Sequence, residues 1–402
     1  MIKRLLFFLC FFVLFYVEPL RVGEVSIAVI WKAGLVLSLL FLLLHSTIKA
    51  QRMPKITFWG LIFAVQSAFN ASFFVGLVEN VSEAMKNTFV PMIYGVGVSI
   101  GNSTQTSEAI YRFVVLLSYS IVFSTVPFLV GLISPISAGY DLSIFGFDTH
   151  GFVGVYQTAH GASITIGTAL VVLFFHLVHS MSFQSRIIAI VAISIGLYSV
   201  YLTYARTGYF ILVVGFLVLL YNSKSNMRYI WLPFSVLSVL LIGFALYEYS
   251  SLFRMRLVGL NIYTQNTMTV SEALGSGRER FWVAVFDYFL AQDLPAKFWG
   301  LGSTVAKEMM LDAVGMRIYA HNGFIDILQF NGFLGAILYL IFLTKIWGEI
   351  RRFRFSKYFP LVSALFVTFL AQMIVQGERI FLADMLFALS IVAARVRFQH
   401  QK

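Results

Sequence analysis

The chain has 402 residues, of which 59% are hydrophobic and 12% are charged, and its formal net charge is +11. A soluble globular domain is about 45–50% apolar and about 25% charged, so this composition excludes an ordinary soluble enzyme. Most Lys and Arg residues stand in short clusters between long apolar runs, a pattern that indicates membrane topology and excludes a nucleic-acid-binding surface as the reason for the charge.

Apolar runs that are too long for the strands of a membrane barrel predict an all-α polytopic membrane protein with about twelve transmembrane helices. The predicted spans cover residues 5–20, 25–44, 56–78, 84–100, 109–133, 153–178, 187–203, 205–221, 229–249, 332–347, 358–376 and 380–394. The first run resembles a signal peptide, but no small-residue cleavage site follows it, so we expect a retained span. It contains Cys10, the only cysteine, which excludes an internal disulfide or a thiolate metal site.

The basic clusters between the spans predict the orientation of the chain. If the twelve spans alternate, the clusters fall on one side: Lys3-Arg4, 49–55, Arg186, 224–228, 351–357 and 395–402. By the positive-inside rule that side is the cytoplasm, so both termini are expected there. The loop 134–152, the Arg206 turn, the segment 250–331 and the turn 376–379 are then expected on the periplasmic side of an inner membrane. Glu378 and Arg379 are expected to pair within the last of these.

Three regions follow from this pattern. Residues 1–249 are predicted to form spans one to nine, residues 250–331 a large periplasmic loop, and residues 332–402 the last three spans and a cytoplasmic tail. Two helices are predicted in the loop. One starts at Ser276-Gly277 with Trp282, Val285, Phe286 and Phe289 on one face, and one is capped by Asn322. Gly300-Leu301-Gly302-Ser303 is predicted as a turn between them.

Three residues on the predicted periplasmic side are candidates for chemistry. Arg278 is placed at a helix start, where backbone N–H groups and a guanidinium would both favour phosphate or diphosphate. Arg206 lies between two apolar runs, where a charge is costly unless it is paired or faces a wet cavity. His321 precedes a predicted helix and is a candidate general base. The alternatives are a surface Arg278, an interfacial anchor at Arg206 and a capping His321.

Weaker candidates lie elsewhere. Lys86 and His160 are expected near the periplasmic ends of their spans, although a Lys there more often snorkels to the membrane surface. His176 and His179 have helical spacing without an obvious third ligand, and we interpret them as structural. The sequence has no phosphate loop and no His-Glu-x-x-His helix, so neither ATP hydrolysis nor a catalytic metal is indicated.

Three separated segments resemble the O-antigen polymerase and O-antigen ligase superfamily. Thr203-Tyr204-Ala205-Arg206-Thr207-Gly208 is similar to the family's Ser/Thr-x-Ser-Arg-Thr/Gly element, with Ala205 in place of the commoner Ser or Thr. The segment 277–282, Gly-Arg-Glu-Arg-Phe-Trp, is similar to Gly-Arg-x-x-x-Trp. The segment 320–324, Ala-His-Asn-Gly-Phe, followed by Gly332 and Gly335, resembles the family's His-Asn element. The turn 298–302 also matches a common element.

The resemblance implies a periplasmic-face glycosyltransferase that uses an undecaprenyl-diphosphate-linked glycan, within a fold of about twelve helices and a periplasmic cap. It implies that Arg206 and Arg278 bind the diphosphate, with Arg280 competing for the role of Arg278, and that His321 is the catalytic base. Lys86 could match a basic residue that the family carries on an early span. No cofactor or metal is required. The expected partners are the lipid-linked glycan, the bilayer and a chain-length regulator, and no nucleic acid.

Two questions stay open at this point. The motifs are shared by polymerases, which join repeat units, and ligases, which move the finished chain onto lipid A-core; the polymerase is favoured by the appearance of the Arg206 and His321 segments. A transporter or flippase of a lipid-linked glycan is the alternative from another class. It would place charges near the bilayer midplane, where Lys32 and Asp384 are the candidates, and an enzyme would gather them in a cavity at the outer face.

Overall fold

The computed structural model describes residues 21–22, 25–50, 53–72, 75–100, 104–134, 150–156, 158–179, 182–223, 237, 241, 243–245, 247–250, 278–315, 317–377 and 379–395. The predicted span 5–20, nearly all of 229–249, and the positions Cys10, Ser276, Gly277 and Glu378 lie outside this part. So do residues 251–277 of the predicted loop and the last seven residues of the chain.

The elements of the described part are helices and one short antiparallel ladder, in which β1 (Arg21–Val22) pairs with β2 (Val25–Ser26) in the register Arg21–Ser26 and Val22–Val25. The first half contains α2 (Ile27–Ala50), α3 (Lys55–Ala68), α4 (Leu77–Ile100), α5 (Thr104–Phe123), α6 (Val126–Leu129), α7 (Ala159–His179), α8 (Phe183–Leu202) and α9 (Arg206–Tyr221). The second half contains α13 (Glu279–Ala291), α14 (Leu294–Trp299), α15 (Gly302–Val314), α16 (Gly323–Arg352), α17 (Phe359–Val375) and α18 (Phe381–Arg395).

Four helical stretches of the described part are long and apolar enough to cross a bilayer: Gln105–Leu129, Ala159–His179, Phe183–Leu202 and Gly323–Arg352. Each predicted span that falls on described residues overlaps a helix. The all-α prediction is thereby confirmed, with four candidate membrane-crossing helices in the described part, whereas the total of about twelve spans is not confirmed.

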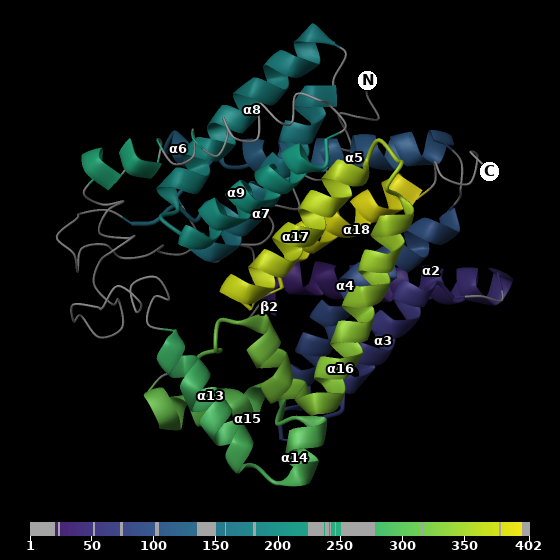
Figure 1. Ribbon diagram of the computed structural model, residues 1–402, viewed down its shortest axis with the longest axis vertical. Coiled ribbons are helices and arrows are strands. Elements are labelled where there is room, and N and C mark those ends of the chain that lie inside the picture. The colour runs from purple at the N-terminus through teal and green to yellow at the C-terminus, as the bar shows by residue number, and fades with distance from the viewer. Residues whose placement is uncertain are drawn as a thin grey trace.

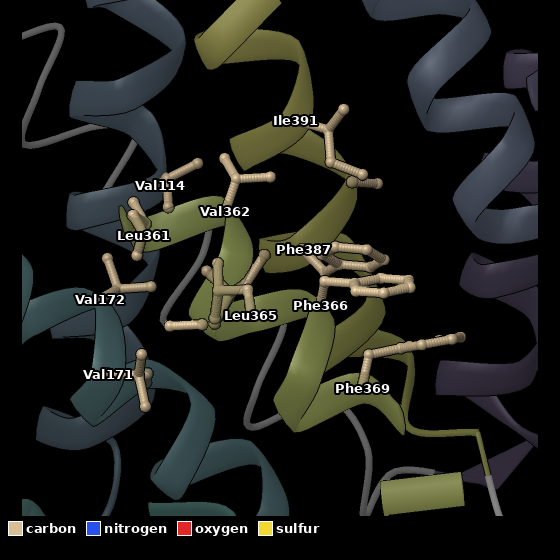
Figure 2. Close-up of a cluster of buried hydrophobic side chains, with 14 of the residues drawn as sticks. Val114, Val171, Val172, Leu361, Val362, Leu365, Phe366, Phe369, Phe387 and Ile391 are labelled. Carbon is tan, nitrogen blue, oxygen red and sulfur yellow. The ribbon is translucent and has the colours of Figure 1, made fainter. Parts of the chain in front are cut away.

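The core is built around α17, which packs against α7, α9, α16 and α18. Its Leu361, Val362, Leu365, Phe366 and Phe369 meet side chains from α5, α7 and α18 (Figure 2). Small residues let the helices approach closely, as is common between membrane helices. Gly208 of α9 lies against Ser163 of α7, and Gly215 lies against Val171 and Thr368.

Helices α13, α14 and α15 gather at one end of the molecule, around the start of α16 (Figure 1). We call these three helices the cap. Phe281, Val285, Met309, Met310 and Ala320 form a separate small core inside it. The predicted helix after Asn322 is confirmed as α16, where the Asn322 side chain accepts from the N–H groups of Phe324 and Ile325.

The structure corrects the sequence prediction for the cap in two respects. Helices α14 and α15 were not predicted, and Gly302 begins α15 where a turn 300–303 was expected. On α13, Phe281 is fully buried and Phe286 is 43% exposed, so Phe281 takes the core position that was predicted for Phe286. Helix α13 begins after Arg278.

The predicted span 56–78 is also too long, because α3 ends at Ala68. The Asn70 side chain accepts from the N–H of Ser72, which is a turn that competes with helix. The N–H of Ala71 then donates to the carbonyl of Gly300, and the Ser72 hydroxyl donates to that of Leu301. The end of α3 therefore holds the residues between α14 and α15 in place through these two hydrogen bonds.

Candidate functional site

The start of α13 is tied to the end of α17. Arg278 is the residue before the first helical position, and its Nη1 donates to the backbone carbonyl of Val375. The last carbonyls of a helix have no partners within the helix and carry a partial negative charge, so a guanidinium is favoured there. Phe281, Val285 and Phe289 bury the inner face of α13 and hold Arg278 in this position.

The segment before His321 is held from both sides. The indole of Trp282 donates to the Ala320 carbonyl at 3.0 Å, and the Ala320 N–H donates to Asp326 at 2.9 Å. His321 itself has a φ of +57°, in the left-handed region that side chains other than glycine rarely adopt. Such backbone persists only where its surroundings impose it, and it occurs often at functional sites.

The imidazole of His321 lies beside Arg278 and the end of α17. Its pKa is lowered to about 4, first by burial and then by the charge of Arg278, against a hydrogen bond to the Gln376 backbone that raises it. The ring centroid is 6.4 Å from that of Phe281. Within the described part of the chain Nδ1 is buried without a hydrogen-bond partner. The ring is therefore neutral at neutral pH, and Nδ1 can accept a proton.

Arg206 begins α9, and the register of the helices brings it to the same end of α17. Ile211 of α9 packs with Ala371 of α17, and Gly215 lies against Thr368, so the two helices run antiparallel. Arg206 is five residues before Ile211, and Gln376 is five residues after Ala371. Because the helices are antiparallel, Arg206 lies at the level of Gln376. Tyr204, two residues earlier, also has left-handed backbone, with a φ of +51°.

His160 joins this part of the structure. Its Nδ1 is 2.7 Å from the hydroxyl of Thr207, the residue after Arg206. Among the described residues, two non-glycine positions have left-handed backbone, and they are Tyr204 and His321. Both stand inside the sequence motifs, at the segments that meet around the end of α17.

Lys86 lies on α4, one helical turn after Glu83. Its Nζ is 2.7 Å from Glu83, and the hydroxyl of Tyr319 donates to the same carboxylate at 3.3 Å. Lys307 lies over the Tyr319 ring at 4.4 Å, and its pKa is lowered, chiefly by burial. The structure thus gives Lys86 a carboxylate partner on its own helix.

Arg280 does not share the position of Arg278. Its guanidinium carbon is 5.1 Å from the centroid of the Phe281 ring, and its Nε is buried without a hydrogen-bond partner among the described residues. The bond to the end of α17 belongs to Arg278. The geometry therefore favours Arg278 over Arg280 as the residue next to His321.

Sequence reasoning missed a polar cavity of about 40 Å³ behind the His321 segment. Its lining includes Glu83, Asn87, Asp326, Asn331 and Arg379. Arg379 was expected to pair with Glu378, which lies outside the described residues.

Arg379 instead binds Asp384 at 2.8 Å, with side chains 6% and 1% exposed. Its guanidinium also lies 4.8 Å from the centroid of the Phe369 ring. A charge beside an apolar span was the available signal, because such a residue needs a partner. The pair anchors the turn that contains Gln376.

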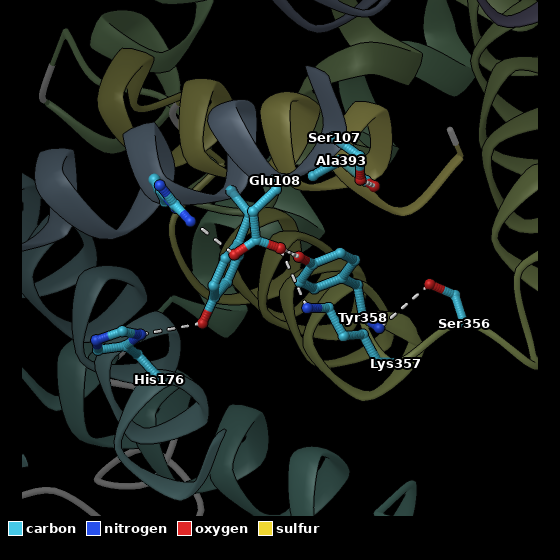
Figure 3. A network of polar contacts seen from close by, with 9 residues as sticks. Ser107, Glu108, His176, Ser356, Lys357, Tyr358 and Ala393 are labelled. Carbon is cyan, nitrogen blue, oxygen red and sulfur yellow. Dashed lines mark hydrogen bonds and ion pairs between the residues drawn. The ribbon is translucent and has the colours of Figure 1, made fainter. Parts of the chain in front are cut away.

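A second polar network lies at the opposite end of the helices. Glu108 accepts from Tyr358 at 2.8 Å and from Lys357 at 3.2 Å, and Tyr111 bonds His176 at 3.2 Å (Figure 3). Helix α17 starts here and ends at the Arg278 contact, and 17 helical residues span about 25 Å.

His176 also bonds Ser185, and His179 bonds the Phe175 carbonyl, so both rings have partners inside the protein. No group of three or more His, Cys, Asp or Glu side chains within the described ranges is placed to hold a metal ion. These contacts agree with the structural interpretation of both histidines.

A family model described as O-Antigen ligase matches residues 189–340. This stretch contains Arg206, Arg278, Arg280 and His321, and it does not contain Lys86. A comparison with curated proteins found no match. The resemblance predicted from the three motifs is confirmed for residues 189–340, which are similar to the O-antigen ligase family.

Proposed function

We propose that this protein is a glycosyltransferase that acts on an undecaprenyl-diphosphate-linked glycan at the periplasmic face of the inner membrane. The domain match supports a ligase- or polymerase-type activity in a multi-pass membrane protein. The observation that carries the assignment of residues is the meeting of Arg278 and His321 at the end of α17. The proposal also includes about twelve spans, cytoplasmic termini and the division of the chain into three regions.

In the proposed reaction, Arg206 and Arg278 bind the diphosphate of the donor. His321 takes the proton of the acceptor hydroxyl, whose oxygen then attacks the anomeric carbon of the donor glycan. The bond from that carbon to the diphosphate breaks, and undecaprenyl diphosphate leaves with the bonding electrons. The two guanidiniums stabilise the negative charge that develops on the leaving group. Nothing in this scheme requires a metal or a nucleotide.

The position of the charges favours an enzyme over a transporter. Arg278 and His321 lie where α17 ends, and the register places Arg206 there as well. Asp384, which was a candidate for a midplane site, is paired with Arg379 in the first turn of α18. A transporter would instead use charges near the middle of its spans.

Polymerases and ligases of this superfamily share the three motifs. The Arg206 and His321 segments resemble polymerases, and we propose a polymerase on that basis. The alternative is a ligase, which the description of the matching family model favours.

The lipopolysaccharide of a deletion strain decides between them on a gel. Single repeat units on the core with no longer chains identify a polymerase. A bare core with accumulated lipid-linked polymer identifies a ligase.

A purified preparation tests the reaction itself. Protein in detergent should form glycosidic bonds from lipid-linked glycan in the presence of EDTA and without nucleotide. Loss of turnover that a divalent cation restores would contradict the metal-free scheme. Absence of any turnover, together with glycan movement across the bilayer of proteoliposomes, would favour the transporter.

A further inference from the structure

The cap exposes apolar side chains on the face turned away from its core. On α13 the outer residues Val283, Phe286 and Leu290 are 59%, 43% and 66% exposed. Their spacing puts them on one side of the helix, opposite the buried Phe281 and Val285. An amphipathic helix that covered a core and faced water would carry mainly polar residues on this side, whereas here Glu279 and Asp287 stand among the exposed apolar residues.

Helix α14 also exposes apolar side chains. Its Leu294 is 78% exposed, and Phe298 and Trp299 are 44% and 46% exposed. Lys297 lies between them, in the last turn. An exposed apolar surface of this kind marks contact with a protein or a membrane. Trp is enriched, and Lys is tolerated, where a protein meets lipid headgroups.

The exposed face lies next to an exposed apolar stripe on a candidate membrane helix. Phe289 of α13 contacts Phe333 of α16, with ring centroids 5.3 Å apart. Phe333, Ile337 and Leu340 are 48%, 55% and 54% exposed, at the i, i+4 and i+7 spacing of one helix face. Because α16 is one of the candidate spans, we expect this stripe to face lipid. The contacts of α13 and α14 with α16 bring their exposed faces next to it.

The packing of α14 against α16 fixes the position of the cap along α16. Both Gly300 and Gly332 have left-handed backbone. A Cβ added to Gly300 would collide with the backbone of Phe330 and Asn331, and a Cβ added to Gly332 would collide with the backbone of residues 297–300. The N–H of Leu301 donates to the Gln329 carbonyl at 2.9 Å. Helix α14 is therefore held against the point where α16 kinks, at Gly332.

We propose that the outer face of α13 and α14 lies in the bilayer, at the boundary between headgroups and acyl chains, and that lipid is what covers it. The cap is then an interfacial element and not a free aqueous domain. If the proposed function also holds, Arg278 at the start of α13 lies at headgroup depth. A lipid-linked donor could then present its diphosphate there while its chain stays in the leaflet.

Spin-label accessibility tests this placement without any measurement of turnover. With Cys10→Ser as background, single cysteines replace Phe286, Leu294, Leu340 and Asp312, the last on the exposed side of α15. In liposomes, labels at 286 and 294 should be more accessible to oxygen, which concentrates in lipid, than to a water-soluble nickel complex. The label at 340 is the lipid reference, and the label at 312 should show the reverse order.

Three results would overturn the proposal. Nickel accessibility at 294 equal to that at 312 would place the face in water. Protection from both reagents would mean that protein covers it. Spin–spin broadening at 294, reversed by dilution with unlabelled protein, would identify a second copy as the cover. Because the labels report depth alone, a failure here leaves the proposed reaction untouched, and an inactive enzyme leaves the depth result valid.

Discussion

The indole Nε1 of Trp282 donates to the backbone carbonyl of Ala320 at 3.0 Å, and so joins two motifs that are 38 residues apart in sequence. One motif carries Arg278 and the other carries His321. The bond holds the residue before His321, whose left-handed backbone needs such support.

Trp282→Phe should therefore weaken catalysis through the position of His321. The ring stays in the cap core, but the Ala320 carbonyl loses its donor, which costs about 1–3 kcal/mol when the carbonyl is left unsatisfied. We expect kcat to fall by at least about fivefold, with less change in KM. Trp299→Phe, at an exposed position, is the matched control and should stay near wild type. Equal kinetics for the two variants would show that the bond does not position His321.

Arg278→Lys should impair activity although the charge is kept. A guanidinium offers a planar fork of donors, and an ammonium cannot both bind Val375 and chelate a diphosphate. The loss of one charge-assisted hydrogen bond costs about 1.5–3 kcal/mol of binding free energy, so we expect kcat/KM to fall roughly 10- to 100-fold. Arg280→Lys is the control, since Arg280 lies on Phe281, and it should lose much less. The reverse order would assign the diphosphate to Arg280.

The turn at Gly332 gives a prediction about stability. Its φ of +64° and ψ of −167° form a conformation that is essentially restricted to glycine. Gly332→Ala should destabilise the folded protein by at least about 1–3 kcal/mol. Gly348→Ala lies in the same helix with open space around the new Cβ, and it should leave stability unchanged or raise it. Thermal unfolding in detergent compares the two, and equal melting temperatures would contradict the role of the kink.

The orientation rests on the basic clusters and is tested by reporter fusions. A fusion at Leu311 should report the periplasm, and one at Lys402 should report the cytoplasm. If both positions report the same compartment, the predicted topology is wrong, and the periplasmic site with it.

The parts of the site that could be predicted are those with local signals. Asn322 before an apolar pattern predicts a capped helix, and α16 begins there. The bond from Arg278 to Val375 had no such signal, because a backbone carbonyl 97 residues away has no sequence signature. The pairing of Arg379 with Asp384 was missed for a related reason. Its five-residue spacing crosses a turn, so neither helix periodicity nor adjacency marks it.

The interaction of Arg278 with His321 predicts an unusual pH dependence. A general base must be neutral to act, and the pKa of His321 is lowered to about 4 by burial and by Arg278. The kcat/KM profile should therefore stay level as the pH falls through 6.5, the ordinary pKa of histidine, and should decline only near about pH 4. Arg278→Gln removes the neighbouring positive charge, so the pKa of His321 rises and the acid limb moves to higher pH. In wild type, a bound diphosphate offsets the charge of Arg278, so the acid limb of the kcat profile should lie at higher pH than the acid limb of the kcat/KM profile.

His321→Ala should lower turnover by about 10²- to 10⁴-fold and abolish the acid limb, while donor binding changes little. An acid limb that survives in His321→Ala belongs to another group, and would remove His321 from the role of the base.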